Sequence, residues 1–165
     1  MKRARLDECI SSKRVRNACV AARGIRLDRF PASWHGKAKK DPTVLSQLLT
    51  PEMALITTDD SMATDHAIHV PIKHAGLVVV TQDDDAVATM THDIAMSIMH
   101  DFKDDFPGWS NVPWDNSIIR ITRKWIRVFT LKDGVPLSDE WIERKDDWQD
   151  RLVAALNRNA VIATP

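Results

Sequence analysis

The chain has 165 residues, 44% apolar and 28% charged, a balance typical of one globular domain. Basic and acidic side chains are equal at 23 each, which argues against a uniformly basic nucleic-acid-binding protein. Two cysteines make neither a disulfide framework nor a zinc quartet, and no apolar run approaches the roughly 20 residues of a membrane helix. We therefore expect a cytoplasmic protein with no membrane partner.

The zero net charge conceals opposite charges in successive segments. Residues 1–40 contain 12 basic and 3 acidic side chains (+9), residues 41–115 contain 2 and 13 (−11), and residues 116–165 contain 9 and 7 (+2). Such asymmetry predicts a basic surface that forms the approach path to an acidic centre. The alternative is a set of solvated faces that partly neutralise one another.

Strand and helix patterns alternate along the chain. Apolar and β-branched runs predict strands that end near Leu6 and that cover residues 25–28, 53–57, 77–81, 117–121 and 125–131. Apolar residues at helical spacing predict helices over residues 12–23, 84–102 and 138–157, and one that starts at Asp41. The run 77–81 is apolar on both faces, which favours a central strand of a parallel sheet.

Particular end signals define two of these helices. Asp41 and Pro42 are residue types preferred at the N-cap and in the first turn, so we expect Asp41 to cap its helix. Ser138 is expected to begin the last helix, which places Trp141 and Trp148 on one stripe. The tail after Asn157 is expected to fray.

This order of elements predicts an α/β fold. We expect a single domain with a mostly parallel central sheet flanked by helices, followed by a C-terminal β-pair and helix. Residues 1–132 are expected to form the main domain, and residues 133–165 a helical extension packed on it.

Acidic residues stand at three of the expected strand–helix junctions. Asp7 and Glu8 follow the first strand, Asp41 starts a helix, and Asp59 and Asp60 follow a buried strand. Ligands of open α/β sheets bind outside the carboxyl ends of the strands. Carboxylates gathered there repel one another unless a cation lies among them, and oxygen ligands suit Mg²⁺ or Mn²⁺. The alternative for each acid is a role as a cap or turn residue.

Four stretches of the sequence, in order, carry a family resemblance. The stretches RLDECISSKRVRNACVAARG, KKDPTVLSQL, ALITTDDSM and HAGLVVVT resemble the PIN-like domains of VapC-type toxins. The resemblance covers roughly residues 5–132 and is greatest to a short subgroup with a D-E strand end, a D-x-x-L helix start and a T-x-D strand end. It implies a single PIN-like domain.

The resemblance also implies an activity and partners. PIN-like toxins are Mg²⁺- or Mn²⁺-dependent endoribonucleases, so the implied function is hydrolysis of RNA phosphodiester bonds by the toxin of a type II toxin–antitoxin pair. The implied partners are an RNA substrate, a cognate antitoxin protein and, as a further option, a second copy in a homodimer.

Site residues follow from the resemblance position by position. It places the catalytic acids at Asp7, Asp41 and Asp59. Glu8 and Asp60 complete the implied metal ligands, and Thr57 and Ser61 support them. The sequence departs from the family pattern at three positions, where Cys9, Ser61 and Met62 replace Asn, Asp and Phe. These departures leave open whether the site is active and whether it binds one metal or two.

The implied chemistry is metal-assisted hydrolysis. A bound ion lowers the pKa of a water molecule and an acid accepts its proton. RNA phosphates next to acids require nearby cations, and an aromatic ring can stack on a base. The residues expected to bind RNA are Lys2, Arg3, Lys13, Arg14, Trp34, Lys37, Lys39 and Lys40.

Other functions compete with this one. A catalytically inactive PIN-like module that binds RNA or a partner is favoured by Ser61. A phospho-receiver domain is favoured by the run from Asp59 to Met62 and by Thr81, although no Lys lies between Lys73 and Lys103.

A transition-metal site is a weaker alternative. The segment Asp65–His69, together with His74, has a spacing that could hold a metal through side chains, but the sequence supplies no convincing complete set of four ligands.

Overall fold

A computed structural model describes residues 2–7, 24–34, 40–82 and 92–162 of the chain. The helix expected over residues 12–23 and the first part of the one expected over residues 84–102 lie outside these ranges. So do Glu8, Cys9 and Cys19.

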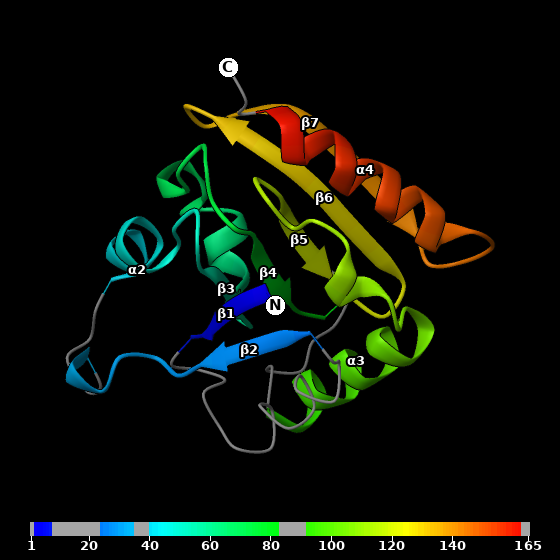
Figure 1. Cartoon of the computed structure of the whole chain (residues 1–165), viewed down its shortest axis with the longest axis horizontal. Coiled ribbons are helices and arrows are strands. Elements are labelled where there is room, and N and C mark those ends of the chain that lie inside the picture. Colours follow the sequence, from blue (N-terminus) through cyan, green and yellow to red (C-terminus); the bar gives the residue numbers. More distant parts are fainter. Residues whose placement is uncertain (1, 8–23, 35–39, 83–91, 163–165) are drawn as a thin grey trace.

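The centre of the fold is a seven-stranded sheet in the order β2-β1-β3-β4-β5-β6-β7 (Figure 1). The strands are β1 (Lys2–Leu6), β2 (Ile25–Asp28), β3 (Ala54–Thr57), β4 (Leu77–Val80), β5 (Ile118–Ile121), β6 (Trp125–Lys132) and β7 (Val135–Glu143). The first five pair in parallel, and the last two pairings are antiparallel. The predicted α/β fold with a mostly parallel sheet is therefore confirmed, and β4 is its central strand as expected.

Helices cover both faces of the sheet. They are α2 (Asp41–Leu48), α3 (His92–Asp105) and α4 (Trp148–Ile162), with short 3-10 helices η2 (Ala32–Trp34), η3 (Asp60–Ala63), η4 (Ala67–His69) and η5 (Trp109–Asn111). One buried cluster contains residues of α3 and α4, and the other contains residues of α2 and η3. Within the described ranges, no helix has the length and apolar character needed to cross a membrane.

The end of the chain differs from the prediction, because residues 135–143 form strand β7 instead of the start of a helix. Asp133 and Gly134 both have positive φ angles, 53° and 78°, which are the angles of a tight hairpin turn. That turn returns the chain along β6. Trp141 therefore lies exposed on a strand, whereas Trp148 is buried in α4. Residues 133–165 thus contribute a strand to the main sheet and are not a purely helical extension.

Two helix ends also differ from expectation. The N-cap of α2 is Lys40, with no side-chain capping bond, and Asp41 is already inside the first turn. Asp41 is consequently not the cap, and its carboxylate turns toward other partners. At the C-terminus α4 continues to Ile162, and Asn159 is only 1% exposed, so the chain does not fray after Asn157.

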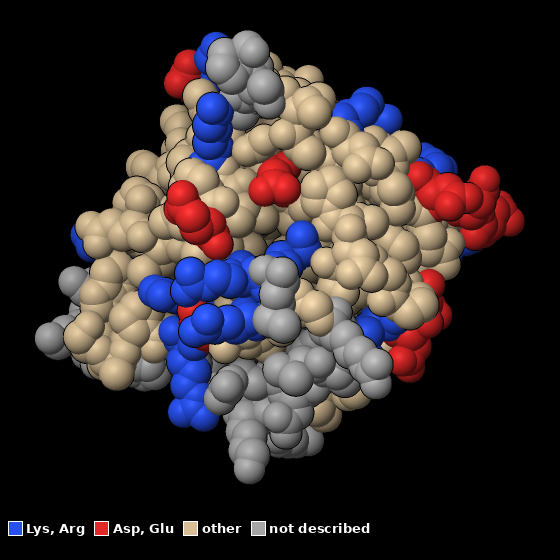
Figure 2. All heavy atoms as spheres, viewed as in Figure 1, with Lys and Arg blue, Asp and Glu red and all other residues tan. Residues whose placement is uncertain are grey.

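The charge on the surface is unevenly distributed. Figure 2 shows Lys and Arg side chains gathered over the region of β1 and β2 in the view of Figure 1. The acidic residues of the candidate site lie where β1 and β3 end.

Candidate functional site

The sheet has a topological switch point between β1 and β3. The order of the first five strands, 2-1-3-4-5, is one of the two common doubly wound arrangements, and ligands bind at such switch points outside the carboxyl ends of the strands. Leu6 pairs with Ile56, and the backbone N–H of Asp7 donates to the Ile56 carbonyl at 2.9 Å. The chain thus places Asp7 and Thr57 together at this edge.

Thr57 connects two of the predicted acids. Its hydroxyl donates to Oδ2 of Asp7 at 2.7 Å, and the backbone N–H of Asp59 donates to the same hydroxyl oxygen at 3.0 Å. Thr57 is fully buried and Asp7 is 6% exposed. The expected supporting role of Thr57 therefore has a geometric basis, since this hydroxyl fixes the positions of both acids.

Ser61 joins Asp59 to the third acid. Its Oγ lies 2.6 Å from Oδ1 of Asp59 and 3.1 Å from Oδ2 of Asp41, and its backbone N–H also donates to Oδ1 of Asp59. A serine hydroxyl carries a single proton and can donate to only one carboxylate at a time. When both acids are ionised, the Ser61 hydroxyl donates to one carboxylate, and its contact with the other carboxylate brings two hydrogen-bond acceptors together. A shared proton or a cation is needed to make this arrangement favourable.

The electrostatics of Asp41 agree with that requirement. Partial burial raises the pKa of Asp41, and a hydrogen bond with Asp59 and the charge of Asp59 raise it further. Ser61 and His66 act in the opposite direction. Nε2 of His66 lies 3.6 Å from Oδ2 of Asp41, with 35% of its side chain exposed. His66 is therefore a partly exposed neighbour of Asp41.

This set of donors fits a magnesium-type ion. Mg²⁺ is commonly held by one or two carboxylates, with the remaining positions filled by water and substrate phosphates. Asp41 and Asp59 provide two carboxylates from different elements. In residues 2–7, 24–34, 40–82 and 92–162, no group of three or more His, Cys, Asp or Glu side chains is close enough to hold a metal. Asp7 is thus linked to Asp59 through the Thr57 hydroxyl and does not form one cluster with Asp41 and Asp59.

Asp60, the other expected ligand, has a different partner. Its two carboxylate oxygens accept hydrogen bonds from Nε and Nη2 of Arg120, at 2.8 and 3.3 Å. Arg120 comes from β5 and is 6% exposed. Both carboxylate oxygens of Asp60 are therefore engaged by a buried arginine.

Two residues near the site escaped sequence reasoning. Arg120 lies within the apolar run IIRI, and a charge inside a buried strand signals a carboxylate partner. His66 was considered only as a transition-metal ligand. In the structure His66 adjoins Asp41, whereas His69 is exposed and His74 is buried elsewhere, so these histidines do not form one site.

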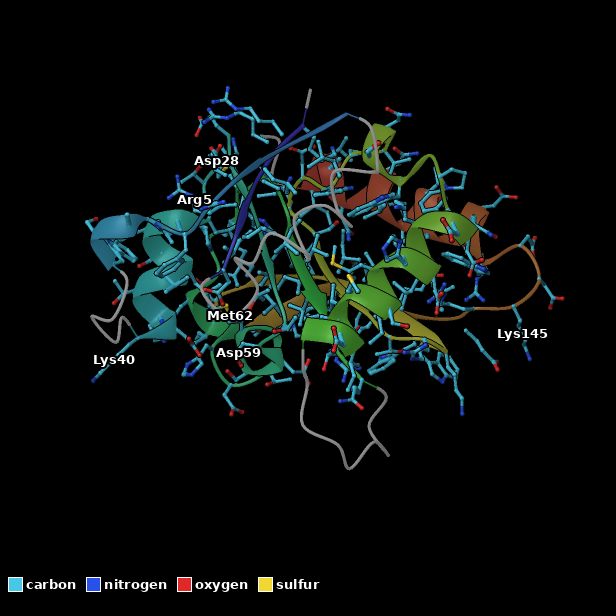
Figure 3. The ribbon with its side chains drawn as sticks, turned by 90° about the horizontal axis from the view of Figure 1, so that it is seen from below. Arg5, Asp28, Lys40, Asp59, Met62 and Lys145 are labelled. Carbon is cyan, nitrogen blue, oxygen red and sulfur yellow. The ribbon has the colours of Figure 1, made fainter. Side chains whose placement is uncertain are left out.

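The remaining expected residues have separate positions. Met62, two residues after Asp60, donates its backbone N–H to the Asp59 carbonyl. It is 1% exposed and belongs to the buried cluster that contains residues of α2 (Figure 3). Trp34 packs edge-to-face on Phe30 at 5.8 Å, and Lys40 is exposed. Four other expected RNA contacts lie outside the described residues: Lys13, Arg14, Lys37 and Lys39.

Comparisons with protein-family models, with curated proteins and with solved structures found no match to this chain.

Proposed function

We propose that the chain is a Mg²⁺- or Mn²⁺-dependent endoribonuclease with a PIN-like domain. The observation that supports this most strongly is the single Ser61 hydroxyl held between the carboxylates of Asp41 and Asp59. Thr57 links this pair to the nearly buried Asp7 at the β1/β3 switch point. An acidic pair that needs a cation, placed where α/β folds bind ligands, suits metal-assisted phosphodiester hydrolysis.

The side chains have distinct roles in this proposal. Asp41 and Asp59 hold the ion, which supplies Lewis acidity and a water of lowered pKa when bound. Thr57 positions Asp59, and Asp7, held by the Thr57 hydroxyl, adds a negative charge nearby. Nε2 of His66, 3.6 Å from Oδ2 of Asp41, is placed beside the ion ligands to accept the proton of that water.

The biological setting of the proposal rests on the family resemblance. It comprises the toxin role, a cognate antitoxin protein, a homodimer and a cytoplasmic location. The alternative that the chain is an inactive RNA- or partner-binding module remains tied to Ser61, which replaces an acid of the family pattern.

A cleavage assay tests the activity. A mixed RNA pool is incubated with Mg²⁺, Mn²⁺ or EDTA and with the wild type, Asp7→Asn, Asp59→Asn or the surface control Asp101→Asn. We expect metal-dependent cleavage by the wild type and by the control, and its loss in both site variants. Cleavage that persists in both site variants would contradict the proposal. A folded, antitoxin-free protein that never cleaves would favour the inactive module.

A phospho-receiver function is the second candidate. The 2-1-3-4-5 strand order is shared with receiver domains, and Thr81, directly after the central strand β4, is 9% exposed. Against it, β5 itself contains no lysine, the first lysine after it is Lys124 directly before β6, and Arg120 is paired with Asp60. Incubation with acetyl phosphate distinguishes the candidates, because only a receiver would acquire a phosphoryl group on Asp59.

A further inference from the structure

One face of β1 and β2 carries a row of arginines. Ala4 and Leu6 of β1, and the apolar residues of β2, are buried in the cluster that contains α3 and α4. Because side chains alternate along a strand, Arg3, Arg5 and Arg26 point to the opposite face. Arg3 pairs in register with Arg26, so two like charges stand directly side by side.

Among the described residues, one acid contacts this row. Asp28 is the acid of β2, and it accepts from Nη2 of Arg3 at 3.3 Å while Nε of Arg26 lies 3.8 Å away. The side chains of Arg3 and Arg26 are 46% and 64% exposed. Arg5, in register with Asp28, and the exposed Arg29 add two further positive charges to this part of the chain. Figure 2 shows this basic area.

Arg5 adds a second, independent observation. It is half-buried beside Asp28, as Figure 3 shows, and its Nε is buried with no hydrogen-bond partner among the described residues. The Nε atom itself is closed to a ligand, whereas the half-buried Arg5 side chain still carries a guanidinium, the group that best matches a phosphate in two-point contacts. We refer to Arg3, Arg5 and Arg26 as the arginine row.

The arginine row points toward the acidic site. Arg3, Arg5 and Asp7 occupy alternate positions of one chain segment and therefore the same face. At a rise of about 3.3 Å per residue, Arg5 lies about 7 Å and Arg3 about 13 Å from Asp7 along the strand. A chain of phosphates lying on the row would therefore lead directly to the carboxyl edge of β1.

We propose that the arginine row binds the phosphodiester backbone of single-stranded RNA and directs it to the acids. The proposal rests on the proposed nuclease function, which it extends by naming the surface that holds the substrate. Carboxylates at the site repel phosphates, so affinity for RNA has to come from a separate basic surface. Contacts of this kind position the backbone without reading its sequence.

A binding experiment tests the row without requiring catalysis. The full-length chain is titrated, in EDTA, into a fluorescently labelled single-stranded RNA of 12 nucleotides at several NaCl concentrations, and anisotropy gives Kd. For Arg5→Gln/Arg26→Gln we expect at least a tenfold weaker Kd at low salt. The slope of log K against log[NaCl] should fall in magnitude by about 1.4, that is about 0.7 for each lost phosphate contact.

Matched variants control for charge and folding. Arg123→Gln removes another exposed arginine, 49% exposed and paired with Asp101, at a distance from the row; we expect its Kd to stay within twofold of wild type. Arg5→Lys keeps the charge but loses the two-point geometry, so it should weaken Kd while leaving the salt slope nearly unchanged. Arg26→Gln alone, at the most exposed member, gives a variant whose folding is least affected.

The outcomes separate the two proposals. Unchanged Kd and slope in the double variant, or an equal loss in Arg123→Gln, would overturn the arginine row whatever the cleavage assay gives. Polyglutamate that competes better than RNA of equal charge would also overturn it, in favour of an acidic protein. Binding with the expected slopes, in a protein that never cleaves RNA, would retain the row and reject the nuclease.

Discussion

Arg120 and Asp60 form a two-point ion pair between β5 and η3, with Nε–Oδ1 and Nη2–Oδ2 distances of 2.8 and 3.3 Å. The arginine side chain is 8% exposed and the aspartate side chain 38% exposed. Because Arg120 lies between Ile119 and Ile121 in a buried strand, its charge has to be compensated within the protein. The pair therefore has a structural role next to the candidate site.

Replacement of Asp60 by Asn should destabilise the protein without abolishing the proposed activity. Asp60→Asn removes the carboxylate charge from the two-point pair with Arg120, and we expect the free energy of unfolding to fall by about 1–3 kcal/mol. Urea unfolding measures this change. RNA cleavage at temperatures where the variant is folded should keep its dependence on Mg²⁺.

An exposed ion pair provides the control for this variant. Asp101→Asn breaks the contact of Asp101 with Arg123, whose side chains are 56% and 49% exposed, and should change stability by less than about 1 kcal/mol. If Asp60→Asn is as stable as Asp101→Asn and also loses metal-dependent cleavage, Asp60 is a metal ligand and not the partner of Arg120.

Replacement of Ser61 by Asp should make the protein depend on a cation. The new carboxylate would lie between Asp41 and Asp59, so three negative charges would repel one another in EDTA. We expect Ser61→Asp to unfold in EDTA with a free energy about 1–2 kcal/mol below that of the neutral isostere Ser61→Asn. Millimolar Mg²⁺ or Mn²⁺ should restore much of the difference, measured as thermal melting with and without the ion. Equal melting of the two variants in EDTA would contradict the arrangement of these carboxylates.

The strands were predictable because their signal is local. The run LVVVT is apolar on both faces, which is possible only for a strand covered on both sides, and β4 is the centre of the sheet. Alternation of Ile25 and Leu27 with polar residues likewise marked β2. The alternation of strands and helices then implied a parallel sheet. Because parallel strands end at the same edge of the sheet, the acids that follow them were expected at one common edge.

The incorrect predictions concern features that depend on long-range contacts. Trp141 and Trp148 are seven residues apart, which suits a helix, but the turn at Asp133 and Gly134 pairs residues 135–143 with β6 and makes them a strand. The partners of Asp60 and Asp41 could not be predicted either. Arg120 and His66 reach them from segments whose placement depends on the whole fold, and local patterns carry no information about such contacts.

His74 should make stability depend on pH between about 4 and 6.5. Burial lowers the pKa of His74 to about 4, and its Nδ1 accepts the backbone N–H of Gly76 at 3.1 Å, so the folded protein holds the neutral ring. The unfolded chain binds a proton on His74 near pH 6.5, so acidification favours unfolding across this window. We expect a loss of about 2 kcal/mol between pH 7 and pH 5 from this residue, measured by urea unfolding.

The variant His74→Asn isolates this contribution. It keeps a side-chain acceptor near the Gly76 N–H but cannot titrate, so its stability should change less with pH than that of the wild type. Asp41, whose pKa is raised in the folded protein, acts with the opposite sign, because its protonation on acidification favours the folded state. Asp41 is present in both proteins, so its contribution to the pH dependence cancels when the two are compared. If the unfolding free energies of the wild type and the variant changed with pH in parallel, the lowered pKa of His74 in the folded protein would be contradicted.

Asn159 should be a major stabilising residue of α4, in the part of the chain expected to fray. Its side-chain amide donates to Ser117 Oγ at 3.1 Å, and its carbonyl oxygen accepts from Ser138 Oγ at 2.7 Å, which ties the helix to β5 and β7. Asn159→Ala removes both hydrogen bonds, one of them to the fully buried Ser117, so we expect a loss of about 2–3 kcal/mol in urea unfolding. The exposed Asn157, two residues earlier, is the matched control, and Asn157→Ala should change stability by less than about 0.5 kcal/mol. Similar small effects of both substitutions would mean that the end of α4 is not held in place by this contact.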